Sequence, residues 1–189
     1  SNKDPFSTFD HSFRTLENSL DNSKNKIFNV EQFIFLSSSM VYGNFKKKVV
    51  KEDDSCNPLG IYAALKLSGE NIIKAYNQVF GLPYTIIRPS ALYGERCISR
   101  RVGQIFIENI LNKKEIVIQG DGKETLDFTY IEDLVNGIIC AIKSKKSLNQ
   151  TFNLTFGKAQ PINKLIYFLR KNFPKVKIKY IKRDRLMPK

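Results

Sequence analysis

Short apolar runs alternate along this chain with longer amphipathic segments. Residues 32–38 are rich in aromatic and β-branched side chains, which favours a buried strand, whereas residues 58–80 repeat apolar side chains at helical spacing. Such alternation is typical of an α/β protein with a parallel sheet. We predict helices at 7–24, 58–80, 100–111, 132–144 and 162–172, and strands at 32–38, 84–88, 116–118, near 152 and at 177–181.

The predicted helix at 58–80 places two reactive side chains on one face. Asn57 is a suitable N-cap and Pro58 a suitable first helical residue, while Tyr62 and Lys66 are separated by four positions. A lysine ammonium within reach of a phenol stabilises the phenolate and so makes the phenol a usable base. The same spacing also arises by chance, when a solvated lysine stem lies over a tyrosine ring.

The surrounding motifs favour the chemical interpretation. The strand 32–38 runs into Ser37-Ser-Ser-Met-Val-Tyr-Gly43, and two further motifs follow the tyrosine and lysine, Ile87-Arg-Pro-Ser-Ala-Leu-Tyr-Gly94 and Gln119-Gly-Asp-Gly-Lys-Glu-Thr-Leu-Asp-Phe-Thr-Tyr-Ile-Glu-Asp133. In this order the motifs resemble the extended short-chain dehydrogenase/reductase family, the NAD-dependent epimerases and dehydratases of nucleotide sugars.

The resemblance implies a fold and a division of the chain. We expect part of a Rossmann-type, doubly wound parallel sheet in residues 1–90 and a smaller α/β substrate domain in residues 91–189. The family's glycine-rich dinucleotide turn does not occur in the sequence. We therefore expect the chain to be a fragment that lacks this turn and the family's closing segment, so that it is inactive by itself.

The resemblance also implies the residues of an active site. Tyr62 would take the proton of a sugar hydroxyl, Ser38 would hydrogen-bond the same oxygen, and Lys66 would assist Tyr62 and hold the nicotinamide ribose. By the same resemblance, the expected cofactor contacts are Ser37, Tyr62, Lys66, Pro89 and Ser90. The expected substrate contacts include Ser38, Ser39, Val117 and Gln119.

Two positions depart from the family pattern at the sugar-nucleotide phosphates. Ala91 and Leu126 stand where relatives usually carry an asparagine and an arginine. Arg100 and Arg101 follow Ser99, a suitable N-cap, and would lie in a first helical turn where the helix dipole disfavours positive charge. We hypothesise that Arg101, assisted by Arg100 or Arg96, binds the diphosphate; the alternative is a pair of exposed arginines without a ligand.

The residues after Ser38 bear on the reaction. Sugar dehydratases carry an Asp-Glu pair at this place, whereas this chain has Ser39 and Met40, which cannot transfer those protons. We expect an NAD-dependent 4-epimerase that works through a transient 4-keto sugar, with NADP left open as the cofactor. The alternatives are a nucleotide-sugar reductase or other oxidoreductase of the family, and a non-catalytic dinucleotide-binding scaffold.

Composition adds few constraints. The net charge of +13 comes largely from scattered lysines, which we interpret as solvated surface. The alternative is that they help to attract an anionic nucleotide sugar, and we expect no nucleic-acid partner. The three cysteines show no paired spacing, so we expect neither a disulfide framework nor a metal site. No long apolar run predicts a membrane contact, and we expect a cytoplasmic protein, with a homodimer through the Tyr62 helix suggested by the resemblance.

Overall fold

The computed structural model describes residues 4–45, 47, 49–97 and 101–182. The chain is a mixed α/β protein that divides into two compact units. The first unit contains the chain up to Pro89 and Val135–Leu154, and the second contains Ser90–Leu134 and most of the chain from Thr155 onward. Among the described residues, no helix is both long and apolar enough to cross a membrane.

The first unit is built on a parallel sheet of three strands in the order β1-β2-β7. Its strands are β1 (Phe33–Leu36), β2 (Tyr84–Pro89) and β7 (Gln150–Leu154), and Leu36 pairs with Ile87 while Pro89 pairs with Leu154. The central strand β2 is buried along nearly its whole length, as expected of a strand covered on both faces. The order of these strands confirms the predicted parallel α/β arrangement.

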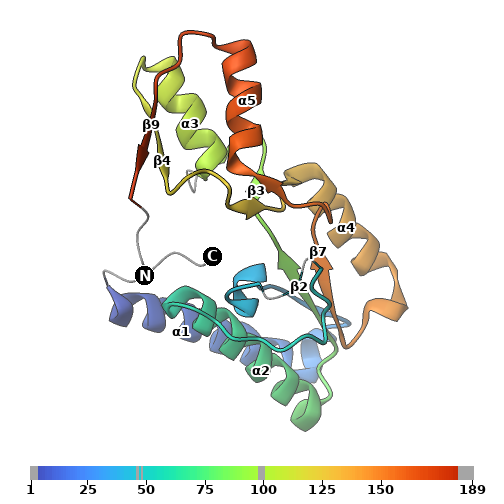
Figure 1. Cartoon of the computed structure of the whole chain (residues 1–189). Coiled ribbons are helices and arrows are strands. Elements are labelled where there is room, and N and C mark those ends of the chain that lie inside the picture. The colour runs from blue at the N-terminus through green and yellow to red at the C-terminus, as the bar shows by residue number, and fades with distance from the viewer. Residues whose placement is uncertain (1–3, 46, 48, 98–100, 183–189) are drawn as a thin grey trace. The chain divides into compact units, whose positions relative to one another are not determined.

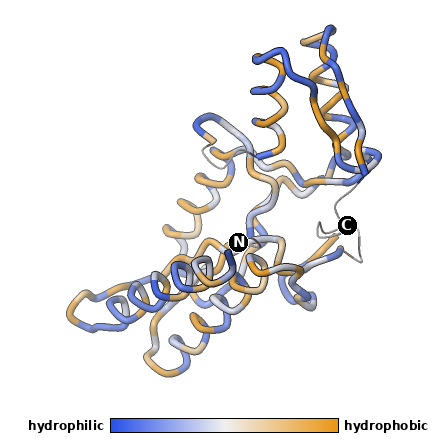
Figure 2. The backbone as a smooth tube through the Cα atoms, turned by 90° about the vertical axis from the view of Figure 1, so that its left-hand side faces the viewer, coloured by the Kyte–Doolittle hydropathy of each residue, from blue (hydrophilic) through white to orange (hydrophobic). Residues whose placement is uncertain are grey.

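Two long helices of the first unit, α1 (Pro5–Ser23) and α2 (Ile61–Phe80), pack against each other (Figure 1). Both are amphipathic, and hydrophobic and hydrophilic positions alternate along the helices in Figure 2. The core that these helices share with the sheet consists of Leu20, Ile73, Leu82, Tyr84 and Ile86.

The helix α2 begins three residues later than the sequence predicts. Its N-cap is Gly60, not Asn57, and no side chain caps it. The carbonyl of Asn57 lies so close to Gly43 that a Cβ at Gly43 would approach its oxygen to 2.0 Å. The chain at Asn57 therefore packs against the turn that follows the serine segment, and this tertiary contact overrides the local preference for a helix start.

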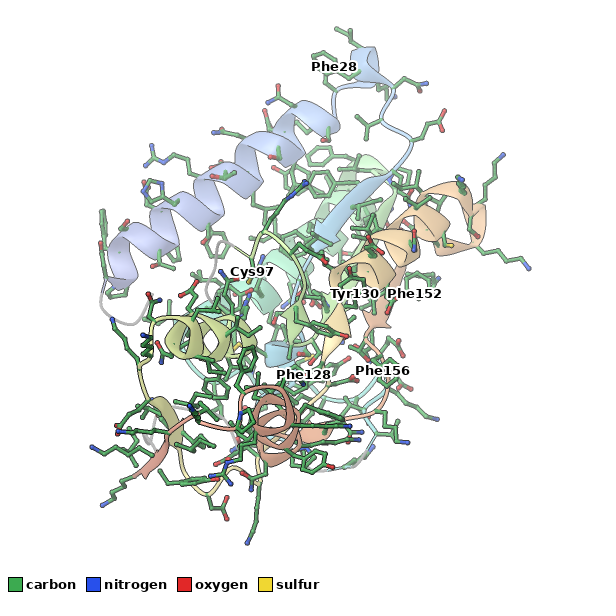
Figure 3. All side chains as sticks on the ribbon, turned by 90° about the horizontal axis from the view of Figure 1, so that it is seen from above. Phe28, Cys97, Phe128, Tyr130, Phe152 and Phe156 are labelled. Atoms are coloured by element: carbon green, nitrogen blue, oxygen red, sulfur yellow. The ribbon has the colours of Figure 1, made fainter. Side chains whose placement is uncertain are left out.

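The other helices and strands that we predicted begin and end within a few residues of the predicted bounds. The 3-10 turns are η1 (Lys26–Phe28), η2 (Ser39–Tyr42) and η3 (Lys145–Ser147), and α4 (Ile131–Lys143) starts in the second unit and continues into the first. Phe28, in the turn between α1 and β1, is 61% exposed (Figure 3).

The described residues of the second unit form three small strand pairs and two helices. The strands β4 (Ile116–Gln119) and β9 (Ile178–Ile181) are parallel, β3 (Leu92–Tyr93) pairs in parallel with β6 (Thr129–Tyr130), and β5 (Thr125–Leu126) is antiparallel to β8 (Gln160–Pro161). The helices α3 (Val102–Leu111) and α5 (Ile162–Asn172) share a core with β4, made of Phe106, Ile116, Ile118, Ile162, Ile166 and Leu169. Tyr93 packs against the rings of Phe128 and Tyr130, which Figure 3 labels.

The buried face of α2 supplies a stability prediction. Ile73 is fully buried, so Ile73→Ala leaves a cavity in the first unit and should lower the free energy of unfolding by about 2–4 kcal/mol. Val79 lies on the same helix but is 71% exposed, and Val79→Ala should change stability by about 0.5 kcal/mol or less. Urea unfolding of the two variants measures the difference, and equal losses would contradict the described packing of α2.

Candidate active site

The serine segment directly follows the end of β1. The amide of Ser37 donates to the carbonyl of Ile87 at 2.7 Å, so one further sheet hydrogen bond follows the last residue of the strand. Ser38 is extended and serves as the N-cap of η2, where its Oγ accepts from the amide of Met40 at 3.2 Å. The backbone of Ser37 is therefore fixed by the sheet, and the side chain of Ser38 by the turn that follows it.

Tyr62 and Lys66 lie in the first turns of α2, as their spacing predicts. The ammonium of Lys66 is 5.8 Å from the centroid of the Tyr62 ring and 5.1 Å from that of Phe35. Burial lowers the pKa of Lys66 below the ordinary value of lysine. Tyr62 remains 37% exposed.

A hydrogen bond from Lys66 joins α2 to the strand that leads into the serine segment. Nζ of Lys66 donates to the carbonyl of Leu36 at 2.8 Å, and Leu36 is only two positions before Ser38. The lysine thus contacts the strand end that presents the serine while lying beside the tyrosine ring. The structure brings the three predicted catalytic side chains to the carboxyl end of β1, where open α/β sheets bind their ligands.

A buried ion pair beside this strand end was not predicted from the sequence. Arg88 and Glu70 form two hydrogen bonds, from Nε to Oε1 at 2.9 Å and from Nη2 to Oε2 at 2.6 Å. Neither side chain is more than 4% exposed. Two signals could have revealed the pair: Arg88 is a charged residue in a strand whose other residues are uncharged, and Glu70 is four residues after Lys66, on the same helix face.

The predicted cofactor contacts Pro89 and Ser90 lie at the carboxyl end of the neighbouring strand β2. Pro89 is the last residue of β2, and half-buried Ser90 comes directly after it. The hydroxyl of Ser37, another predicted cofactor contact, donates to Oε1 of Glu70 at 2.5 Å. The amide of Ser37 already donates to Ile87, so contacts of Ser37 with a cofactor would use its backbone carbonyl or the lone pairs of its hydroxyl.

The predicted substrate contacts of the second unit divide into two groups. Val117 and Gln119 share the exposed side of β4, whose alternate residues Ile116 and Ile118 are buried, so a ligand can reach both. Exposed Arg101 is the N-cap residue of α3 and not part of its first turn, which corrects the predicted helix start.

The predicted contact with the substrate phosphates also involves Ser99, Arg100 and Leu126. Ser99 and Arg100 lie outside the described residues. Leu126, which stands where relatives usually carry an arginine, packs against the core of the second unit. An apolar residue at this position therefore serves packing, and any phosphate contact there must come from another side chain.

Comparison with known proteins identifies the family. A family model described as the NAD dependent epimerase/dehydratase family matches residues 1–155. The chain belongs to this family. This membership confirms the resemblance of its motifs, and the parallel sheet confirms the expected α/β fold of Rossmann type.

Three members of the epimerase/dehydratase family illustrate the likeness. "Uncharacterized UDP-glucose epimerase YtcB" of Bacillus subtilis is 34% identical over 137 residues, which are 72% of this chain and 43% of the relative. The UDP-glucuronic acid 4-epimerase of Bacillus cereus, solved with UDP-glucuronic acid and NAD, is 30% identical with a TM-score of 0.87, over 94% of this chain and 56% of that one. The UDP-N-acetylglucosamine 4-epimerase of Methanobrevibacter ruminantium, solved with UDP-N-acetylmuramic acid, is 28% identical with a TM-score of 0.90, over 100% and 61%.

The chain spans about half the length of these relatives. The family match extends over the serine segment, the Tyr62 helix, β2, α3, β4 and α4. The roles assigned to individual site residues remain predictions.

The lowered pKa of Lys66 gives a testable pH dependence. Folded protein releases this proton at a lower pH than unfolded protein, so between the two pKa values the unfolded state binds more protons and stability rises with pH. Relative to Lys66→Met, which keeps a stem but has no proton to lose, the wild type should therefore gain stability as the pH rises toward the ordinary lysine pKa of 10.5. Urea unfolding across this range measures the difference, and a stability difference independent of pH would show that Lys66 is not desolvated.

Proposed function

We propose that the protein is an NAD-dependent nucleotide-sugar 4-epimerase in which Ser38, Tyr62 and Lys66 act on the sugar. The observation that carries this proposal is the contact between Lys66 and the carbonyl of Leu36, because it gathers a serine, a phenol and an ammonium at one strand end. Membership of the epimerase/dehydratase family and the NAD and UDP-sugar ligands of its solved relatives support it.

The side chains at this strand end suit a nicotinamide nucleotide and a sugar hydroxyl. Lys66 uses one donor for Leu36, and its remaining ammonium protons can hydrogen-bond a ribose. The Oγ of Ser38 accepts a hydrogen bond from Met40, which leaves its own proton for a substrate oxygen. The Tyr62 hydroxyl forms no hydrogen bond with any residue that the structure describes, so it is available to the substrate.

Each group then has a defined part in the reaction. Bound NAD would supply the acceptor and later the donor of the hydride at the sugar carbon. Tyr62 takes the proton of the sugar hydroxyl as that carbon is oxidised, and returns it when the carbon is reduced from the other face. Ser38 donates a hydrogen bond to the same oxygen throughout, and the nearby positive charge of Lys66 stabilises the tyrosinate.

The turn after Ser38 favours epimerisation over dehydration. Ser39 and Met40 form the start of η2, and neither side chain can serve as the acid or base that water elimination needs. The substrate class follows from the same proposal: an anionic nucleotide sugar, with Ser39 near the sugar. In the second unit, Arg101, with Arg100, would bind the diphosphate, and the exposed side of β4 at Val117 and Gln119 would contact the nucleotide.

Removing the phenolic hydroxyl tests the proposed base. Tyr62→Phe should lower kcat for 4-epimerisation of UDP-hexoses by about 10²- to 10⁴-fold, because proton transfer from the sugar is lost. NAD affinity should stay within a few-fold, since the ring and Lys66 remain. Steady-state kinetics and NAD titration of the full-length protein provide both values.

A second tyrosine on the same helix is the control. Tyr76 packs against the ring of Phe80 at 5.2 Å, away from the serine segment in sequence, and Tyr76→Phe should leave kcat unchanged. An unaltered rate in Tyr62→Phe would reject Tyr62 as the base, whereas a wild-type protein that binds NAD but does not epimerise UDP-hexoses would favour the non-catalytic scaffold.

The diphosphate contact is tested by Arg101→Ala. Loss of a charge-assisted hydrogen bond to phosphate should raise KM for the UDP-sugar about 10-fold or more while kcat changes little. Arg170, which is exposed in the last turn of α5, provides the matched control, and Arg170→Ala should not alter KM. If KM is the same in both variants, Arg101 does not bind the substrate.

A further inference from the structure

The ion pair of Glu70 and Arg88 does more than neutralise two buried charges. Besides Arg88, the carboxylate of Glu70 accepts from Oγ of Ser37 at 2.5 Å. Besides Glu70, the guanidinium of Arg88 donates from Nη1 to the hydroxyl of Tyr42 at 2.6 Å. Ser37 and Tyr42 are the residues directly before and four positions after Ser38, so one ion pair holds both ends of the segment that contains the serine.

The Tyr42 hydroxyl has both a donor and an acceptor as partners in this network. The Tyr42 hydroxyl accepts from Arg88 and donates to Oδ1 of Asn153 at 2.8 Å, which uses its single proton. Burial raises the pKa of Tyr42 and outweighs the opposite effect of Arg88, so the hydroxyl keeps this proton at neutral pH. Asn153 lies in β7, and the network therefore reaches the third strand of the sheet.

Arg88 and Asn153 also hold the loop that contains Val50 and Glu52. Nη1 of Arg88 also donates to the carbonyl of Glu52 at 3.1 Å, while the carboxylate of Glu52 accepts from the amide of Asn153 at 2.8 Å. Nδ2 of Asn153 donates to the carbonyl of Val50 at 3.1 Å. Strand ends, helix and loop of the first unit are thus joined by one set of hydrogen bonds.

The guanidinium of Arg88 keeps its charge in this network. Burial lowers the pKa of Arg88, but the hydrogen bonds and charge of Glu70 outweigh burial and hold this pKa above its ordinary value. Buried ion pairs are weak stabilisers as such, because desolvation offsets most of their attraction and apolar residues of similar volume often serve as well. An apolar pair could not, however, hold the hydroxyls of Ser37 and Tyr42.

We propose that the Glu70–Arg88 pair is the positioning element of the active site, which fixes the turn from Ser37 to Tyr42 and thereby aims the hydroxyl of Ser38. The inference rests on the proposed function, since it takes Ser38 as a catalytic residue. Glu70 is one helical turn from Lys66, so the same helix face positions both the serine and the lysine.

The test uses Tyr42→Phe, which removes a single hydroxyl and leaves the ion pair whole. Substituting Glu70 or Arg88 would leave a buried charge unpaired and unfold the protein. In the full-length protein, kcat should fall about 10- to 100-fold at nearly constant KM, because the serine is misplaced while the binding groups are intact. Ser37→Ala, which releases the other end of the segment, should have an effect of the same kind.

A second readout does not depend on activity. The amides of Met40, Val41 and Gly43 are hydrogen-bonded within the turn, to Oγ of Ser38 and to the carbonyls of Ser38 and Met40. Their hydrogen exchange should accelerate about 10-fold in Tyr42→Phe, because the turn opens locally when one end is released. Ser19→Ala, which loses an exposed hydroxyl bonded to the carbonyl of Thr15, and Tyr76→Phe are the controls.

The two readouts separate the possible failures. If exchange accelerates but the wild-type protein does not epimerise UDP-hexoses, the network positions the turn and the proposed function is wrong. If Tyr62→Phe is inactive while Tyr42→Phe keeps wild-type kcat and exchange, the enzyme stands and the positioning inference is overturned. Equal effects of Tyr42→Phe and Tyr76→Phe on kcat would also overturn it.

Discussion

The end of β1 is tied to α2 through two consecutive residues, and the candidate site depends on this constraint. The carbonyl of Leu36 accepts from Lys66, and the hydroxyl of Ser37 donates to Glu70, one helical turn further along α2. A helix could otherwise slide or rotate against a strand end, since apolar packing is not directional. Two polar contacts one helical turn apart fix both motions, so the serine and the tyrosine have a defined relation.

The cost of this arrangement is the burial of polar and charged groups. Ser37, Glu70 and Arg88 are each at most 4% exposed and lie beside an apolar core. They are tolerated because the carboxylate receives three hydrogen bonds and the guanidinium is shared among Glu70, Tyr42 and the carbonyl of Glu52. A network satisfied to this degree favours one arrangement of its members, whereas apolar side chains would permit several.

Much of the fold could be predicted because local sequence patterns specify it. The helix at Ile162–Asn172 was predicted with the bounds observed, since its apolar positions and its flanking residues agree. The start of α2 was predicted incorrectly, since Asn57 and Pro58 have the local preference for a helix start but pack instead against Gly43, a residue distant in sequence. Arg101 was likewise placed two residues too far into its helix.

Local patterns in the sequence were enough to place Tyr62 and Lys66 on one helix face, and the order of the motifs identifies the family. They were also enough to predict the alternation of strands and helices, because side-chain periodicity is a local property. The folded chain was needed to show that Lys66 reaches Leu36 and that Glu70 and Arg88 hold the ends of the serine segment. These contacts join residues 18 to 46 positions apart, and no local preference can specify which distant partner satisfies a buried charge.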